Sequence, residues 1–114
     1  MKKYELYWKN NNIGSLIETN WEMRSYGDIL FNPAFLIETS ENRRLLNLIE
    51  NSVKASKYLD EGDDDNYDKM CEEANDFLDL INSPDWYVIN DKSEIVKILC
   101  PMFHENNEIT WQNK

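Results

Sequence analysis

Apolar and polar residues alternate at both ends of the chain and recur at helical spacing in its middle. The run YELYWK at residues 4–9 places large apolar side chains at every second position, which is the period of a half-buried strand. Asn10–Asn12 interrupts this alternation, and Asn tolerates the left-handed backbone that a hairpin loop needs. The first third therefore predicts an antiparallel meander of three strands, at residues 4–9, 13–19 and 26–31.

The middle of the chain predicts a short helical turn followed by two helices. Asn32-Pro33 supplies a good N-cap and a residue suited to the first helical position, so a turn of helix is expected over residues 34–37. A longer helix is expected from a cap at Thr39 or Ser40 to about Leu59. The second helix is predicted from apolar residues at steps of three and four, namely Tyr67, Met70, Cys71, Ala74, Phe77, Leu78 and Ile81.

Strand patterns return after Ser83-Pro84, which is expected to end the second helix. Three further strands are predicted, at residues 86–89, 94–99 and 108–111. The order β-β-β-α-α-β-β-β predicts an α+β fold, with one mostly antiparallel sheet of about six strands and the helix pair on one face. The length suits a single domain over residues 1–114.

The net charge of the chain is concentrated in one stretch. Residues 60–85 hold eleven of the twenty-two acidic side chains but only one base, Lys69, and so account for the whole net charge of −10. This charge disfavours direct binding to nucleic acid or to an anionic membrane surface. Met1-Lys2-Lys3 leads into no apolar signal core, and no apolar run is long enough to span a bilayer. A cytoplasmic protein is expected.

The acidic stretch does not match a calcium-binding loop. An EF-hand loop needs Gly at its sixth position and Glu at its twelfth. Counting from Asp63 places Asp68 and Ala74 at these positions, and the register that starts at Asp60 fails as well. A solvated acidic loop without a metal is expected.

Signatures of catalysis are missing from the sequence. Cys100 and His104 are expected roughly 13 Å apart in an extended segment, too far for a nucleophile and its base. Cys71 and Cys100 are expected to be buried thiols, and two Cys with one His do not complete a zinc site. No Gly-rich phosphate loop, G-x-S-x-G elbow or H-E-x-x-H motif is present. We expect no enzyme and no cofactor.

Two surfaces are candidates for binding a partner. The loop at residues 20–26 carries residue types that are enriched at interfaces, namely Trp21, Met23 and Tyr26. The second helix and the loop before it offer an acidic surface, namely Asp63, Asp64, Asp65, Glu72, Glu73, Asp76 and Asp79. Each surface has a plainer explanation: the loop side chains cover a sheet edge, or the acids are only a solvated face. The tryptophans of the predicted strands, Trp8, Trp86 and Trp111, are expected in the core.

Scattered positions along the chain resemble a family of small uncharacterised bacterial proteins. That family has an I-G strand, a segment like W-x-Y-G-x-F-x-P-x-F and a closing apolar–x–Trp strand. The matching positions here are Ile13-Gly14, Trp21, Tyr26-Gly27-Asp28, Phe31, Pro33-Ala34-Phe35 and Ile109-Thr110-Trp111. Residues 22–25 lengthen the spacing between the Trp and the Tyr in this chain. Such proteins are similar in size and acidity to the immunity proteins of bacterial toxins, so the resemblance implies a toxin as partner.

These features predict a non-enzymatic acidic binding protein of the immunity or inhibitor type. It would occlude a basic protein, such as a toxin nuclease, to which its carboxylates are attracted. Two alternatives stay open. One is a structural or adaptor domain whose acidic helix only confers solubility. The other is a small hydrolase or ligand-binding protein, which a deep pocket with a buried acid would favour.

Overall fold

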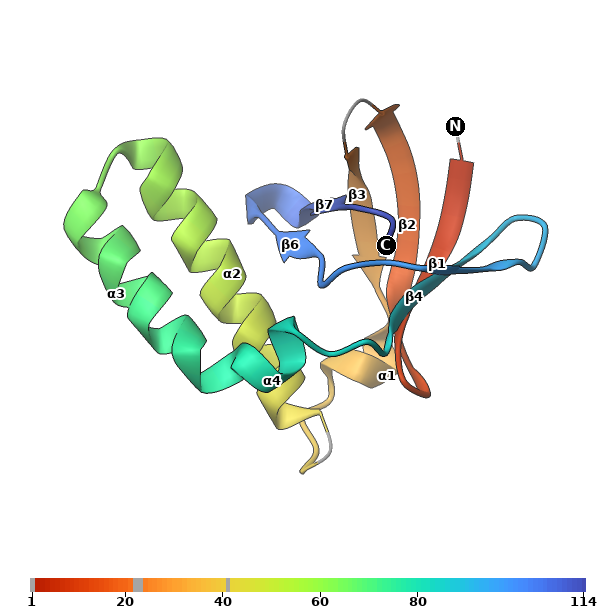
Figure 1. Ribbon diagram of the computed structural model, residues 1–114, viewed down its shortest axis with the longest axis horizontal. Helices are drawn as coiled ribbons and strands as arrows, with labels where there is room; N and C mark the ends of the chain where they lie inside the picture. Colours follow the sequence, from red (N-terminus) through yellow and green to blue (C-terminus); the bar gives the residue numbers. More distant parts are fainter. Residues whose placement is uncertain (1, 22–23, 41) are drawn as a thin grey trace.

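The computed structural model describes residues 2–21, 24–40 and 42–114, apart from the side chain of Trp21 (Figure 1). Its strands form one antiparallel sheet in the order β5-β4-β1-β2-β3-β7-β6. The strands are β1 (Lys2–Trp8), β2 (Asn11–Trp21), β3 (Ser25–Phe31), β4 (Trp86–Asn90), β5 (Ile95–Lys97), β6 (Met102–Phe103) and β7 (Glu108–Trp111). The α+β class and the single antiparallel sheet are therefore confirmed.

Two details of the sheet differ from the prediction. The hairpin β2–β3 is longer than predicted, because β2 continues to Trp21, which pairs with Ser25. The strand β6 was not predicted, since two residues are too few to show an alternation. This strand pairs with β7 and adds the seventh strand.

Neither outer strand leaves a long open edge. Beyond β5, Ile98 forms a bridge with Asn113, and the backbone N–H of Leu99 donates to the carbonyl of Gln112 at 3.0 Å. The segment after β7 therefore pairs with the segment after β5 and closes the sheet on itself. At the other edge the Phe103 N–H donates to Ser52 Oγ at 2.9 Å, and this hydroxyl donates back to the Phe103 carbonyl at 3.0 Å. A helix thus covers the edge of β6.

The core lies inside the closed sheet and continues toward the helices. Inside the sheet, the rings of Tyr4 and Trp111 meet edge to face with centroids 5.7 Å apart. Trp86 is fully buried and its indole N–H donates to the Leu80 carbonyl at 2.8 Å. Trp8 is partly buried and packs against this core. The expectation that the tryptophans of the strands belong to the core is confirmed for Trp86 and Trp111, whereas Trp8 lies at the border of the core.

Local signals set the helix ends. Asn32 caps the first helix by accepting from the Ala34 N–H at 3.0 Å, and Gly62 ends the second with a left-handed φ of 70°. The helical elements are α1 (Pro33–Leu36), α2 (Arg43–Glu61), α3 (Asp64–Ala74), the 3₁₀ turn η1 (Asn75–Phe77), α4 (Leu78–Ile81) and the 3₁₀ turn η2 (Glu105–Asn107). The predicted second helix is thus divided into three pieces. No helix in the described ranges is long and apolar enough to cross a membrane.

The two long helices have different neighbours. α2 lies against β6, whereas α3 packs chiefly on α2 (Figure 1). Because α3 packs mainly against one helix, the stripe of Tyr67, Met70 and Ala74 is only partly covered. None of the side chains of α3 is fully buried. Cys71 lies outside that stripe and is exposed, so the prediction that it is buried is wrong.

Candidate functional site

The acidic stretch lies mainly on the helices that stand away from the sheet. Figure 1 shows α3 at one side of the molecule, separated from the sheet by α2. Asp64 and Asp65 lie in the first turn of α3 and Glu72 and Glu73 in its last, and all four side chains are exposed. The charge of this part of the chain therefore faces solvent on one side of the protein.

Two acids of this stretch have partners within the protein. Asp79 accepts two hydrogen bonds of 2.6 Å from the Arg44 guanidinium, which also donates to the Asp76 carbonyl at 2.9 Å. The hydrogen bonds from Arg44 lower the pKa of Asp79 to about 2. Asp63 caps α3 by accepting from the backbone N–H of Asn66 at 3.3 Å and from its side-chain amide at 2.7 Å. Both carboxylates have structural uses here.

The other acids of the candidate surface are unpaired. In the part of the chain that the structure describes, no hydrogen bond or ion pair uses the carboxylates of Asp64, Asp65, Glu72, Glu73 or Asp76. The helix dipole favours Asp64 and Asp65 in the first turn of α3. It disfavours Glu72 and Glu73, which lie at the negative end. Bases of α2 lie near two of these acids, since Glu73 acts electrostatically on Lys54 and Asp76 on Arg44, but no hydrogen bond or ion pair reaches their carboxylates in the described ranges.

The second predicted surface is the tip of the hairpin β2–β3. Tyr26 lies on β3 and is 40% exposed. Met23 lies outside the described residues, as does the side chain of Trp21. In Figure 1 the ends of β2 and β3 that flank this loop lie well apart from α3. The described part of the second surface is therefore not brought together with the acidic surface.

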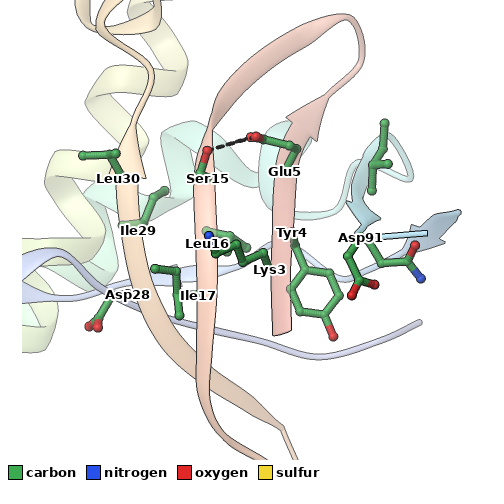
Figure 2. A pocket seen from close by; sticks show the side chains of 12 residues that line it. Lys3, Tyr4, Glu5, Ser15, Leu16, Ile17, Asp28, Ile29, Leu30 and Asp91 are labelled. Atoms are coloured by element: carbon green, nitrogen blue, oxygen red, sulfur yellow. Dashed lines mark hydrogen bonds between the residues drawn. The ribbon is translucent and has the colours of Figure 1, made fainter. Parts of the chain in front are cut away.

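A cavity of about 610 Å³ lies on the sheet (Figure 2). Figure 2 shows Glu5 beside Ser15, whose hydroxyl donates to both carboxylate oxygens at 3.0 Å, while Asp28 and Asp91 lie on opposite sides. All three carboxylates are on exposed residues, and Leu30 on the rim is 76% exposed. The cavity is thus open and lacks the buried acid that a hydrolase or ligand-binding site would favour.

His104 forms a contact that sequence reasoning missed. Its Nδ1 lies 2.6 Å from Ser56 Oγ on α2, and its Nε2 lies 3.1 Å from Thr110 Oγ1 on β7. Burial lowers the pKa of the imidazole. Hydroxyls occupy both ring nitrogens, so the side chain joins a helix to the sheet, and no carboxylate orients it as in a catalytic triad. Residues 48 positions apart give no sequence signal of such a contact.

Cys100 lies near His104 in sequence but has its own environment. Its thiol donates to the Pro101 carbonyl at 3.6 Å, and burial raises its pKa to about 12. A thiol with this pKa stays protonated and unreactive at neutral pH. Within the described ranges, no three His, Cys, Asp or Glu side chains come together as the ligands of a metal would.

Comparison with protein-family models, with curated proteins and with solved structures finds no match to this chain. No related protein therefore assigns a role to the candidate site. Its most distinctive part is an exposed helix with unpaired carboxylates, attached to the rest of the protein mainly through α2.

Proposed function

We propose that this protein is a non-enzymatic binding domain that captures a basic protein with the acidic surface of α3. The observation that supports this most is that the carboxylates of Glu72, Glu73 and Asp76 are exposed and form no ion pair in the described ranges. Two of these carboxylates, those of Glu72 and Glu73, lie at the unfavourable end of a helix dipole. A surface that serves the fold alone would interleave several bases to gain ion pairs one turn apart, whereas α3 has the single base Lys69.

The binding mechanism is electrostatic attraction followed by close contact. Residues 60–85 carry the whole net charge and lie largely to one side of the molecule, so the field is directed. Such a field accelerates encounter with a cationic partner and repels nucleic acid. The partner class is a basic protein such as a toxin nuclease, whose phosphate-binding active site this domain would cover. We place this immunity or inhibitor role in the cytoplasm.

The alternative function is an adaptor or structural domain whose acidic helix only keeps it soluble. Both functions expect exposed carboxylates on α3, and they differ in the effect of removing them. Solubility depends on the net charge of the whole surface, whereas capture of a partner depends on where the charge lies.

A pair of variants with equal net charge separates these functions. The first variant, E72Q/E73Q/D76N, neutralises three acids of the acidic surface. The control, D28N/D91N/E94Q, neutralises three exposed acids on the sheet side. Basic proteins retained by the wild type at low salt are purified, and their association rates with each form are measured. We expect the first variant to associate about tenfold more slowly and the control to match the wild type. Equal slowing of both variants would favour the adaptor.

A further inference from the structure

A groove of about 230 Å³ runs beside the acidic surface, and it is formed by α2, α3, Ile81 of α4 and residues 100–104. Its floor is the side of α2 that carries Leu48, Ala55 and Leu59. One wall is α3, with Tyr67 and Ala74, and the opposite wall is residues 100–104. Figure 1 shows α2 between α3 and β6, in agreement with these walls.

Hydrogen bonds hold both walls in place. The Asn51 side-chain amide donates to the Met70 carbonyl at 3.1 Å and joins α3 to α2. On the other side, Ser52 pairs with the backbone of Phe103, and Ser56 Oγ meets His104 Nδ1 at 2.6 Å. The groove is therefore formed before any partner arrives, which reduces the entropy that binding must overcome.

The groove exposes large apolar side chains. Leu59 is 56% exposed on the floor and Met102 is 49% exposed on the wall. A smaller cavity of about 160 Å³ shares Cys100 and Met102 with the groove and adds Leu99, which is 48% exposed. Exposed apolar side chains gathered along a concave surface mark a docking site for a protein partner.

The charges next to the groove are mainly negative. No Lys or Arg is among the described residues that line it. Asp60 acts electrostatically on His104 at one wall, and Asp68 acts on Tyr67 at the other. Glu108 and Arg24 also face His104, and the Arg24 guanidinium reaches Met102 Sδ at 4.0 Å, so one base lies among three acids at these walls. An apolar floor between acidic rims is complementary to apolar side chains flanked by Lys or Arg.

We propose that this groove binds an amphipathic helix of the basic partner, with its apolar face on Leu59 and Met102. A helix fits better than an extended strand, because the backbone N–H and C=O of Phe103 already bond to Ser52. A helix satisfies its own backbone and needs only side-chain contacts. This inference rests on the proposed function, since it states where the basic partner inserts its apolar side chains.

The test uses a synthetic helical peptide of Leu and Lys with all Leu on one face, and a scrambled peptide of the same composition. Binding to the full chain is measured by fluorescence anisotropy at low salt. We expect the amphipathic peptide to bind about tenfold more tightly than the scrambled one. The variant L59A/M102A should lose this preference. The control L36A/L78A truncates side chains of similar exposure, 54% and 48%, outside the groove and should keep it.

The outcomes distinguish a failure of the groove proposal from a failure of the proposed function. If L59A/M102A keeps the preference, or if the Met102 methyl resonance does not shift when the amphipathic peptide is added, the groove proposal is wrong. The proposed function would survive that result as long as E72Q/E73Q/D76N weakened binding of both peptides. If E72Q/E73Q/D76N bound both peptides as tightly as the wild type, the proposed function itself would be wrong.

Discussion

The side chain of Asn42 holds the connection between α1 and α2, and its loss should destabilise the whole protein. Asn42 is 6% exposed. Its amide donates to the carbonyls of Phe35 at 2.6 Å and Ile37 at 3.0 Å, and its oxygen accepts from the Thr39 N–H at 2.7 Å and from the Thr39 hydroxyl at 3.0 Å. N42A removes all four bonds and leaves partly buried backbone groups without a partner. At about 1 kcal/mol for each bond, we expect a loss of roughly 2–4 kcal/mol in the free energy of unfolding.

Urea unfolding followed by tryptophan fluorescence measures this loss. The control is N47A, because Asn47 is exposed on the same helix and its change should stay within about 0.5 kcal/mol. The slope of the free energy against urea should be the same for both variants, so that the midpoints report stability. A loss below about 1 kcal/mol for N42A would refute the reasoning, since it would mean that the four bonds contribute little.

Three further outcomes follow from the structure. G27A should weaken the pairing of β2 with β3 and lower the unfolding midpoint more than G62A. A Cβ at Gly27 would lie 2.2 Å from the Ile17 carbonyl oxygen, whereas Gly62 has open space and Ala is disfavoured there only by the left-handed φ of 70°. Because the pKa of His104 is lowered in the folded protein, the unfolded chain binds this proton more readily. The free energy of unfolding should therefore be highest above about pH 6.5 and fall at lower pH. Urea unfolding at a series of pH values should show a weaker dependence of this free energy on pH for H104Q. R44A should raise the Asp79 pKa toward 3.8 in a carboxyl NMR titration, with little change in unfolding midpoint because the pair is exposed.

Local signals in the sequence predict much of the fold. Asn32-Pro33 marks the start of α1 and Gly62 the end of α2, because capping depends on neighbouring residues only. Contacts between distant residues are not predictable in this way. The bridge of Ile98 with Asn113, which closes the sheet, and the Ser52 bonds to Phe103 depend on the tertiary arrangement.

The same division holds for the candidate site. The sequence alone indicates that acids gather at residues 60–85, because charge is read directly from composition. It does not show that Asp79 is paired with Arg44, 35 residues earlier, while Glu72 and Glu73 are not paired. The groove beside α3 is also absent from the sequence pattern, since α2, α3 and residues 100–104 meet only in the folded protein.

The salt dependence of association tests the central claim most directly. The rate at which the purified basic partner binds the wild type and E72Q/E73Q/D76N is measured from about 0.05 to 0.5 M salt. We predict that the wild-type rate falls steeply with salt, whereas the rate of the variant starts lower, falls less and meets the wild type at high salt. Two curves of the same height and slope would contradict the claim that the acidic surface of α3 captures the partner.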